Sequence, residues 1–419
     1  REKMKLELSN RVQILSESMT IAISSLARSM KAAGEDVISL SAGEPDFDTP
    51  KAVKEAVIEA MEKGASKYTA SAGTPECLKA VAYKLKNENN LNYSTSDIIT
   101  SVGAKHSLFS VFSALINKGD EVIIPVPYWV TYPEIVKYCG GVPVFVQGDK
   151  NNKLKITAGN LKKAITPRTK AIVPVHLYGQ CADMEPLMAI ARRHKLYVVE
   201  DTAQAIGATY TFSNGLQQKA GCIGDIGTTS FFPSKNLGCY GDGGALFIRD
   251  HELAERARMI ANHGQKIKYH HSVVGCNSRL DTLQAAILDV KLKYLDEYSA
   301  ARNQAAEHYD KGLATVKGII LPQRAANSTH VFHQYTIRVQ NHLRDELKSF
   351  LAEHDVPSMI YYPIPLHLQK AYAKKGQGQG TFPVAEQLSE EVLSLPMHTE
   401  MKAEEQEYII EQIRRFFNR

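Results

Sequence analysis

The chain has 419 residues, enough for two or three domains or for one large α/β unit. Its hydrophobic fraction of 44% and charged fraction of 23% are ordinary for a globular protein, which excludes a disordered, coiled-coil or collagen-like chain. The net charge of +5 is small and scattered, so it argues against a dedicated nucleic-acid binder.

No stretch approaches the roughly 20 apolar residues that a membrane span needs. The charged segment 1–10 has no signal-peptide core. The six cysteines include no CxxC pair, which argues against a zinc or thioredoxin-like site. We therefore expect a cytoplasmic protein with reduced thiols, no metal, and no nucleic-acid or membrane partner.

The front of the chain begins with helical patterns. Residues 15–35 have helical spacing, and VISLSAGEPDFDTP after them is predicted to be a short strand that enters a loop. Residues 51–63 and 75–88 are predicted to be amphipathic helices.

From residue 97 onward, short apolar runs rich in β-branched residues alternate with helical stretches. The runs are DIITSVG, GDEVIIPVP, GVPVFVQG, KAIVPVHLYG, KLYVVEDT and GTTSFFPSK. This alternation predicts βαβ units, an α/β fold and a mostly parallel sheet that is buried on both faces.

Residues 283–312 are predicted to form a long amphipathic helix with a bend, and we place a domain boundary within it. The strand THVFHQYTIRV, the helix DELKSFLAEH and the terminal helix EEQEYIIEQIRRFF follow, which indicates a smaller α+β domain. The segment GQGQG predicts a flexible loop. We expect a large domain over 40–300 and a small domain over 1–39 plus 301–419.

Two residues could carry the chemistry of a bound cofactor. Asp201 ends the run VVED, at the carboxyl edge of a predicted strand, where open α/β sheets bind ligands. Lys235 follows a second apolar run, in SFFPSKNLG. This lysine could form a Schiff base with an aldehyde cofactor, while the carboxylate keeps a pyridine nitrogen protonated. The spacing alone fits a surface lysine and a helix-capping aspartate equally well.

Two further segments are expected at the same edge. The loop SVGAKHS joins a predicted strand to a helix, and its small residues and the helix N-terminus suit a phosphate. Trp129, the only tryptophan, lies between a strand and a helix in PVPYWVTYPE. Its ring could stack on a planar cofactor, although a core or interface position explains an aromatic residue as well.

Long motifs in the rear of the chain resemble the DegT/DnrJ/EryC1 family of pyridoxal-phosphate sugar aminotransferases, most of all the enzymes that aminate UDP-linked 3-keto hexuronic acids. These motifs cover about residues 160–419 and are EDTAQAIGA, GDIGTTSFFPSKNLGCYGDGGA, HGQKIKYHHSVVGCNSRLDTLQAAIL and YYPIPLHLQKAY. Residues 5–150 are instead similar to class I aspartate aminotransferases, through SAGEPDFDTP, KYTASAGTPE, SVGAKHSLF and GDEVIIPVPYWVTYPEIVKYCGG. The chain therefore resembles a mosaic whose switch lies within 145–172.

Both resemblances imply the fold type I architecture of pyridoxal-phosphate enzymes and a homodimer with active sites at its interface. They imply that Lys235 forms the Schiff base and moves the proton, that Asp201 pairs with the pyridine nitrogen and that Gln204 binds the phenolic oxygen. The remaining implied cofactor contacts are a phosphate cup of Gly103, Ala104, Lys105 and Ser230, and Trp129 stacked on the ring.

Each resemblance also implies a residue that reaches the phosphate from the partner subunit. The sugar aminotransferase pattern assigns this role to Asn277, and the class I pattern assigns it to Tyr68. The residues expected to face the substrate are Arg279, Gly43, His333 and His367.

A missing arginine bears on the substrate. Class I enzymes bind the α-carboxylate with an arginine near the C-terminus, because its fork suits a carboxylate. The corresponding stretch LSLPMHTEM has none. We therefore predict ping-pong transfer from L-glutamate to a nucleotide-linked keto sugar through Lys235. The alternatives are an aspartate aminotransferase specified by the front part, and a folded pyridoxal-phosphate-binding chimera with little turnover.

Overall fold

The computed structural model describes residues 26, 29–35, 48–65, 69–126, 128–129, 131–148, 155–369 and 378–418. Most of the predicted helix over 15–35, the strand after it and part of the GQGQG loop lie outside these residues. The same holds for two predicted site residues, Gly43 and Tyr68.

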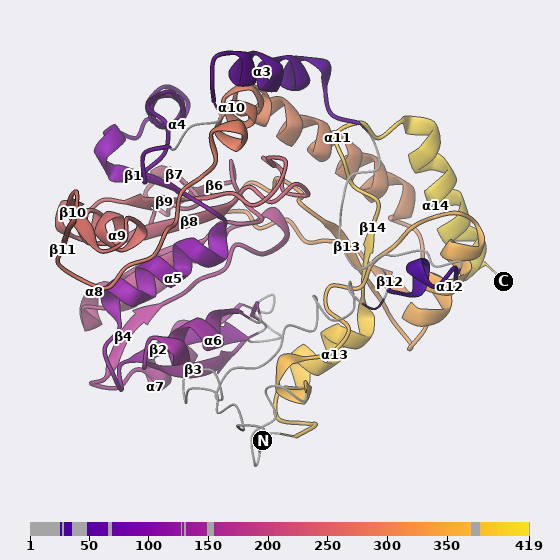
Figure 1. The fold of residues 1–419 in the computed structure, drawn as a ribbon. Helices are drawn as coiled ribbons and strands as arrows, with labels where there is room; N and C mark the ends of the chain where they lie inside the picture. Colours follow the sequence, from indigo (N-terminus) through magenta and orange to yellow (C-terminus); the bar gives the residue numbers. More distant parts are fainter. Residues whose placement is uncertain are drawn as a thin grey trace, which may run out of the picture.

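Seven strands of the described chain form the central sheet, in the order β1-β9-β8-β5-β4-β2-β3 (Figure 1). Their bounds are β1 Ile98–Ser101, β2 Glu121–Val126, β3 Val142–Gln147, β4 Thr169–Ile172, β5 Tyr197–Asp201, β8 Ile226–Ser230 and β9 Gly244–Ile248. Strand β9 is antiparallel to its neighbours β1 and β8, whereas the other neighbouring pairs are parallel. The predicted mostly parallel α/β sheet is thereby confirmed.

Helices cover both faces of this sheet, which explains why strands β8 and β9 are buried along their whole length. One core joins α5, α6 and α9 to the sheet, a second joins α7 and α8, and a third joins α3, α4 and α10. The bounds are α3 Lys51–Glu62, α4 Pro75–Asn89, α5 Ala104–Leu115, α6 Thr131–Tyr138, α7 Ala158–Ala164, α8 Met184–His194, α9 His251–Ala261 and α10 Thr282–Lys291.

Local sequence sets where several of these helices begin. Thr74 precedes α4 and accepts a hydrogen bond from the Cys77 amide, while Pro75 occupies the first helical position, where no amide hydrogen is needed. Asp250 caps α9 in the same way through the Leu253 amide. The first of these caps begins α4 at residue 75, where the predicted helix over 75–88 begins.

The predicted long helix over 283–312 is divided in two. A 3-10 turn at Leu292–Tyr294 separates α10 from α11 (Leu295–Leu313), which accounts for the expected bend. In Figure 1 these helices lead from the large sheet to the part of the molecule that holds the small sheet. Helix α11 therefore carries the chain from one core to the other.

The small sheet is antiparallel, with the order β12-β13-β14. Its strands are β12 Ile319–Ile320, β13 Tyr335–Val339 and β14 Val392–Leu395, and its helices are α12 Arg344–Glu353, α13 Pro383–Glu391 and α14 Ala403–Phe417. The core around this sheet contains residues from Ala306 to Ile413. We propose on this basis that the domain boundary lies near residue 300.

One predicted strand is shorter than expected. The run THVFHQYTIRV is extended in a sheet only from Tyr335, because the preceding backbone has other partners. The Val331 amide donates to the Gly179 carbonyl and the Gln334 amide to the Tyr178 carbonyl. A contact with the large-sheet region thus replaces the predicted strand pairing over 329–334.

Short hairpins complete the described fold. They are β6 Thr209–Thr211 with β7 Gln217–Lys219, and β10 Gln265–Ile267 with β11 His270–His271. Within the described ranges, no helix is both long and apolar enough to cross a membrane.

Candidate active site

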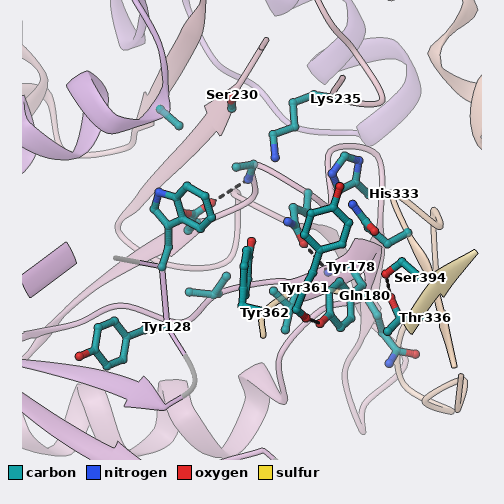
Figure 2. A pocket seen from close by; sticks show the side chains of 18 of the residues that line it. Tyr128, Tyr178, Gln180, Ser230, Lys235, His333, Thr336, Tyr361, Tyr362 and Ser394 are labelled. Carbon is teal, nitrogen blue, oxygen red and sulfur yellow. Dashed lines mark hydrogen bonds between the residues drawn. The ribbon is translucent and has the colours of Figure 1, made fainter. Parts of the chain in front are cut away.

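A cavity of about 1640 Å³ lies at the carboxyl edge of the large sheet. Its walls come from the ends of β5 and β8, the start of α5, the loop after β2, and segments 357–367 and 394–400. Figure 2 shows Lys235 and His333 on one side of this space, with Tyr361 and Tyr362 facing them. The cavity therefore joins residues that are far apart in the sequence.

Asp201 ends β5 and has a fixed orientation. Its Oδ1 accepts a hydrogen bond from the Ala203 amide at 2.8 Å, and its Oδ2 accepts one from the Tyr132 hydroxyl. Its own amide donates to the Pro174 carbonyl at 2.9 Å. Since the side chain also lines the cavity, a cationic group there would meet a carboxylate whose geometry is set in advance.

A buried hub lies behind Asp201, on the other face of the same strand. The Glu200 carboxylate is fully buried and accepts three hydrogen bonds from amides of the 221–224 turn and one from His176 Nε2 at 2.8 Å. His176 Nδ1 accepts from the Ala182 amide, which assigns the proton to Nε2. The His176 amide also donates to the Asp201 carbonyl. This hub fixes the end of the strand that carries Asp201.

Lys235 lies in the loop after β8 and points into the cavity (Figure 2). Burial lowers the pKa of Lys235 to about 8, the charge of Lys105 acts in the same direction, and Asp201 opposes them. A larger fraction of this amine is therefore neutral near pH 7 than of an ordinary lysine, whose pKa is 10.5. Only the neutral amine can attack an aldehyde or accept a proton, so this environment activates the lysine.

The start of α5 forms an anion site beside Ser230. Gly103 caps the helix with a φ of 118°, and first-turn amides such as those of Ala104 and Lys105 have no acceptor inside a helix. Gly244 permits the close approach, because a Cβ there would lie 2.5 Å from the Gly103 carbonyl carbon. Ser230 ends β8 and lines the cavity next to this helix start. This arrangement suits a phosphate.

Trp129 and Gln204 also line the cavity, together with Lys235 and Asp201. The Trp129 ring lies 5.5 Å from Lys105 Nζ and 5.4 Å from the Tyr362 ring. Gln204 Oε1 accepts a hydrogen bond from the Tyr178 amide at 2.7 Å. This bond holds the Gln204 side chain at the cavity wall, where its amide group can donate to a phenolic oxygen of a bound molecule.

His333 and His367 both line the cavity. Burial, with the charges of Lys235 and Arg302, holds the pKa of His333 well below its usual value, so its ring is neutral. His333 Nδ1 bonds to Asn236 Oδ1 at 3.2 Å, which assigns the proton to Nδ1 and makes Nε2 an acceptor. His367 Nε2 is bonded to Glu386 at 2.7 Å.

Asn277 and Arg279 do not line the cavity of their own chain. Asn277 is exposed and pairs through its backbone with Asn262, just after α9. The neighbouring β10–β11 hairpin and the segment after it expose large apolar side chains, namely Ile267, Tyr269 and Val274. The structure therefore separates these two predicted residues from the group around Lys235 within one protomer.

Sequence reasoning did not single out several residues of this site. Tyr132 lies in the quoted motif PVPYWVTYPE, one helical turn after Trp129, and that spacing is the signal that could have found it. Tyr178 lies in the quoted run KAIVPVHLYG, and its hydroxyl donates to the Tyr361 carbonyl. Arg302, buried on α11, donates to the carbonyls of Phe332 and Met397.

The described residues fit a pyridoxal phosphate group. They provide an activated lysine, a carboxylate for a pyridine nitrogen, a helix N-terminus with a serine for a phosphate, and an aromatic wall for a flat ring. No group of three His, Cys, Asp or Glu side chains in the described part of the chain is arranged to hold a metal ion.

Comparisons with known proteins agree with this fit. The model of the DegT/DnrJ/EryC1/StrS aminotransferase family matches residues 98–414. The chain is 48% identical over 300 residues to the UDP-N-acetyl-3-dehydro-alpha-D-glucosamine 3-aminotransferase of Acidithiobacillus ferrooxidans, covering 72% of this chain and 78% of that protein. It superposes on the crystal structure of Streptomyces venezuelae DesV in complex with a ketimine intermediate, with a TM-score of 0.78, 34% identity, and 95% and 97% of the two chains covered.

A second kind of relative also matches. The chain is 46% identical over 204 residues to the aspartate aminotransferase of Bacillus sp. (strain YM-2), which covers 47% of this chain and 52% of that protein. The sugar aminotransferase family match begins at residue 98, so it includes part of the front that resembles class I enzymes.

Proposed function

The chain belongs to the DegT/DnrJ/EryC1/StrS family and is a pyridoxal-phosphate-dependent aminotransferase, and we propose that it moves an amino group from L-glutamate to a nucleotide-linked keto sugar. The observation that carries this proposal is the buried Lys235 amine at the edge of a cavity that also holds Asp201. The cavity is larger than an amino acid requires, which supports a substrate of nucleotide-sugar size.

We propose that Lys235 holds the cofactor covalently through Nζ. Bound pyridoxal phosphate supplies an electron sink for the bond that breaks at the substrate carbon. When Lys235 Nζ is not bonded to the cofactor, it takes the proton from that carbon of the amino donor. In the second half-reaction it delivers a proton to the corresponding carbon of the keto acceptor. Asp201 keeps the pyridine nitrogen protonated, and the α5 start with Ser230 binds the phosphate.

We propose that His333 helps to orient the sugar. Its ring is neutral, and its Nε2 has no proton when Nδ1 donates to Asn236, so it can accept a hydrogen bond from a substrate hydroxyl. His367 is fixed by Glu386 and forms another part of the same wall. These two side chains are suited to bind and orient a substrate rather than to transfer protons to the reacting carbon.

We propose a homodimer in which Asn277 and Arg279 serve the partner's site. Their separation from the cavity of their own chain supports this arrangement. Tyr269 in the β10–β11 hairpin is 78% exposed and Val274 just after the hairpin is 96% exposed, as expected for a surface that another subunit covers. In this homodimer, the geometry of the subunit interface determines whether the partner's phosphate contact comes from Asn277 or from Tyr68.

Half-reactions test this function. L-glutamate should abolish the visible absorbance band of the purified holoenzyme, and a UDP-linked 3-keto sugar should restore it. Lys235→Ala should lack both responses and turnover. Lys219→Ala is the matched control, because Lys219 is a partly buried lysine whose pKa burial also lowers, but it lies outside this cavity. Full turnover by Lys235→Ala would contradict the mechanism.

The same experiment separates the alternative functions. An aspartate aminotransferase is the second candidate, favoured by the 46% identity over 204 residues to such an enzyme. A response to L-aspartate without any response to the sugar would establish it in place of our proposal. Bound cofactor with no response to any donor would instead indicate a folded chimera with little turnover.

A further inference from the structure

Tyr132 connects the front of the chain to the proposed cofactor carboxylate. It lies in the first turn of α6, its side chain is 1% exposed, and its ring packs in the core that α5, α6 and α9 share. Its hydroxyl reaches across 69 residues of sequence and donates to Asp201 Oδ2. Each carboxylate oxygen of Asp201 thus has one neutral donor, since the Ala203 amide bonds to Oδ1.

The direction of this hydrogen bond does not change with pH in the working range. Burial first, and then the negative charge of Asp201, raise the pKa of Tyr132 well above its usual value. The hydroxyl therefore stays protonated and remains the donor. Two other titratable groups face this pair, namely Tyr362, whose pKa is also raised by burial, and Lys235.

We propose that Tyr132 is a positioning residue for amino transfer, which fixes the rotamer of Asp201 and disperses its negative charge. In this way it sets how strongly Asp201 binds the protonated pyridine nitrogen. The inference rests on the role of Asp201 in the proposed function. A hydrogen bond to a carboxylate stabilises its charge, so removal of the donor concentrates that charge on the side that faces the ring.

Tyr132 and Asp201 come from parts of the chain that resemble different enzyme families. Tyr132 belongs to the part of the sequence that resembles class I aspartate aminotransferases, whereas Asp201 belongs to the part that resembles sugar aminotransferases. Trp129 lies one turn earlier in the same segment. One short segment of the front therefore provides both a ring beside the cofactor and the donor that tunes its carboxylate.

The test is a pH titration of the visible band of the holoenzyme, which reports the proton on the nitrogen through which Lys235 holds the cofactor. In Tyr132→Phe the concentrated charge of Asp201 favours the protonated form. The midpoint should therefore rise by roughly 0.5 to 1 pH unit, the effect of one hydrogen bond. Incorporation of 3-fluorotyrosine at position 132, a stronger donor, should move the midpoint down.

Tyr309→Phe is the matched control. Tyr309 is fully buried in the small-sheet core, its hydroxyl donates to the Pro396 carbonyl at 3.0 Å, and it does not line the cavity that holds Asp201. It should lower the melting temperature of the apoprotein without moving the midpoint. An unchanged midpoint in Tyr132→Phe, with a loss of stability like that of Tyr309→Phe, would show that Tyr132 has only a structural role.

Asp201→Asn distinguishes this inference from the proposed function. If Asp201→Asn moves the midpoint and Tyr132→Phe does not, the role of Asp201 stands and the inference about Tyr132 is wrong. If neither variant moves it, the assignment of Asp201 itself fails. In the double variant, Tyr132→Phe should add no further shift, because its effect passes through the carboxylate.

Discussion

Two regions of the chain build the cofactor site, and they hold their side chains by different means. In the rear region, β5, β8 and the loop after β8, the strands are buried and the Glu200 hub binds the backbone behind Asp201. In the front region, which comprises α5, the loop before α6 and the first turn of α6, the Trp129 and Tyr132 side chains are held by contacts with other side chains. In the proposed mechanism the rear supplies the reactive groups on a buried, hydrogen-bonded backbone, and the front supplies their surroundings.

This difference predicts two kinds of mutational effect. A change in the rear region should lower the stability of the sheet edge and cofactor binding together. A change in the front region should alter how the cofactor is held or titrates, while most of the folding free energy remains. The variants below test this division, beginning with the largest expected effect.

Glu200→Ala should have the largest effect on stability. It removes the acceptor of three buried amides and of His176, and unpaired buried polar groups cost about 3–5 kcal/mol in comparable cases. Urea unfolding of the apoprotein measures the loss, and cofactor retention should fall with it. Glu185→Ala is the control, because Glu185 accepts two hydrogen bonds from Ser213 at the surface and should cost far less. Equal losses in the two variants would contradict the rigid-hub model.

Trp129→Ala should weaken the front wall without unfolding the protein. The ring is only partly buried, so we expect a modest change in the free energy of unfolding. Loss of an aromatic contact with a flat ring should weaken cofactor binding about tenfold. Equilibrium dialysis with pyridoxal phosphate measures the dissociation constant, and Trp129→Phe should retain part of the affinity. Unchanged affinity in the alanine variant would show that the ring does not contact the cofactor.

The same division explains how much of the site the sequence could predict. Asp201, Trp129 and Lys235 each follow an apolar run, and parallel strands bring their carboxyl ends to one edge, so their proximity follows from the pattern, whereas Ser230 is implied only by the family resemblance. The fold class follows for the same reason. Hydrophobic patterns report which face a residue occupies, and that information suffices for these positions.

The remaining contacts depend on tertiary structure. The partner of the Tyr132 hydroxyl is 69 residues away, and no local pattern identifies it. The backbone of 331–334 bonds to the 178–179 turn, so a run with good strand propensity is not in the sheet. Glu200 was visible in VVED, but only the fold shows that its carboxylate binds the 221–224 turn.

The pH dependence of cofactor attachment should follow the lysine. Because burial lowers the pKa of Lys235 to about 8, attachment of pyridoxal phosphate to the apoprotein should accelerate with pH, with a midpoint of about 8. In the unfolded chain this lysine retains its proton up to its ordinary pKa of 10.5. The unfolded state therefore binds more protons between these values, and the stability that this group contributes to the apoprotein rises with pH there. Stopped-flow absorbance and urea unfolding at several pH values measure the two effects.

The smallest expected effect is a shift in the pH midpoint of cofactor attachment when a charge near Lys235 is removed. Each of the two regions contributes one such charge, so this shift can be measured for both. Lys105 of the front region lowers the pKa of Lys235, and Asp201 of the rear region raises it. Lys105→Met should therefore move the attachment midpoint to higher pH, and Asp201→Asn should move it to lower pH. Lys137→Met, which removes a cavity lysine paired with Glu134, should leave the midpoint in place. Shifts of the same sign in the first two variants would show that the regions do not act on Lys235 in opposition, and an unchanged midpoint in both would show that burial alone lowers its pKa.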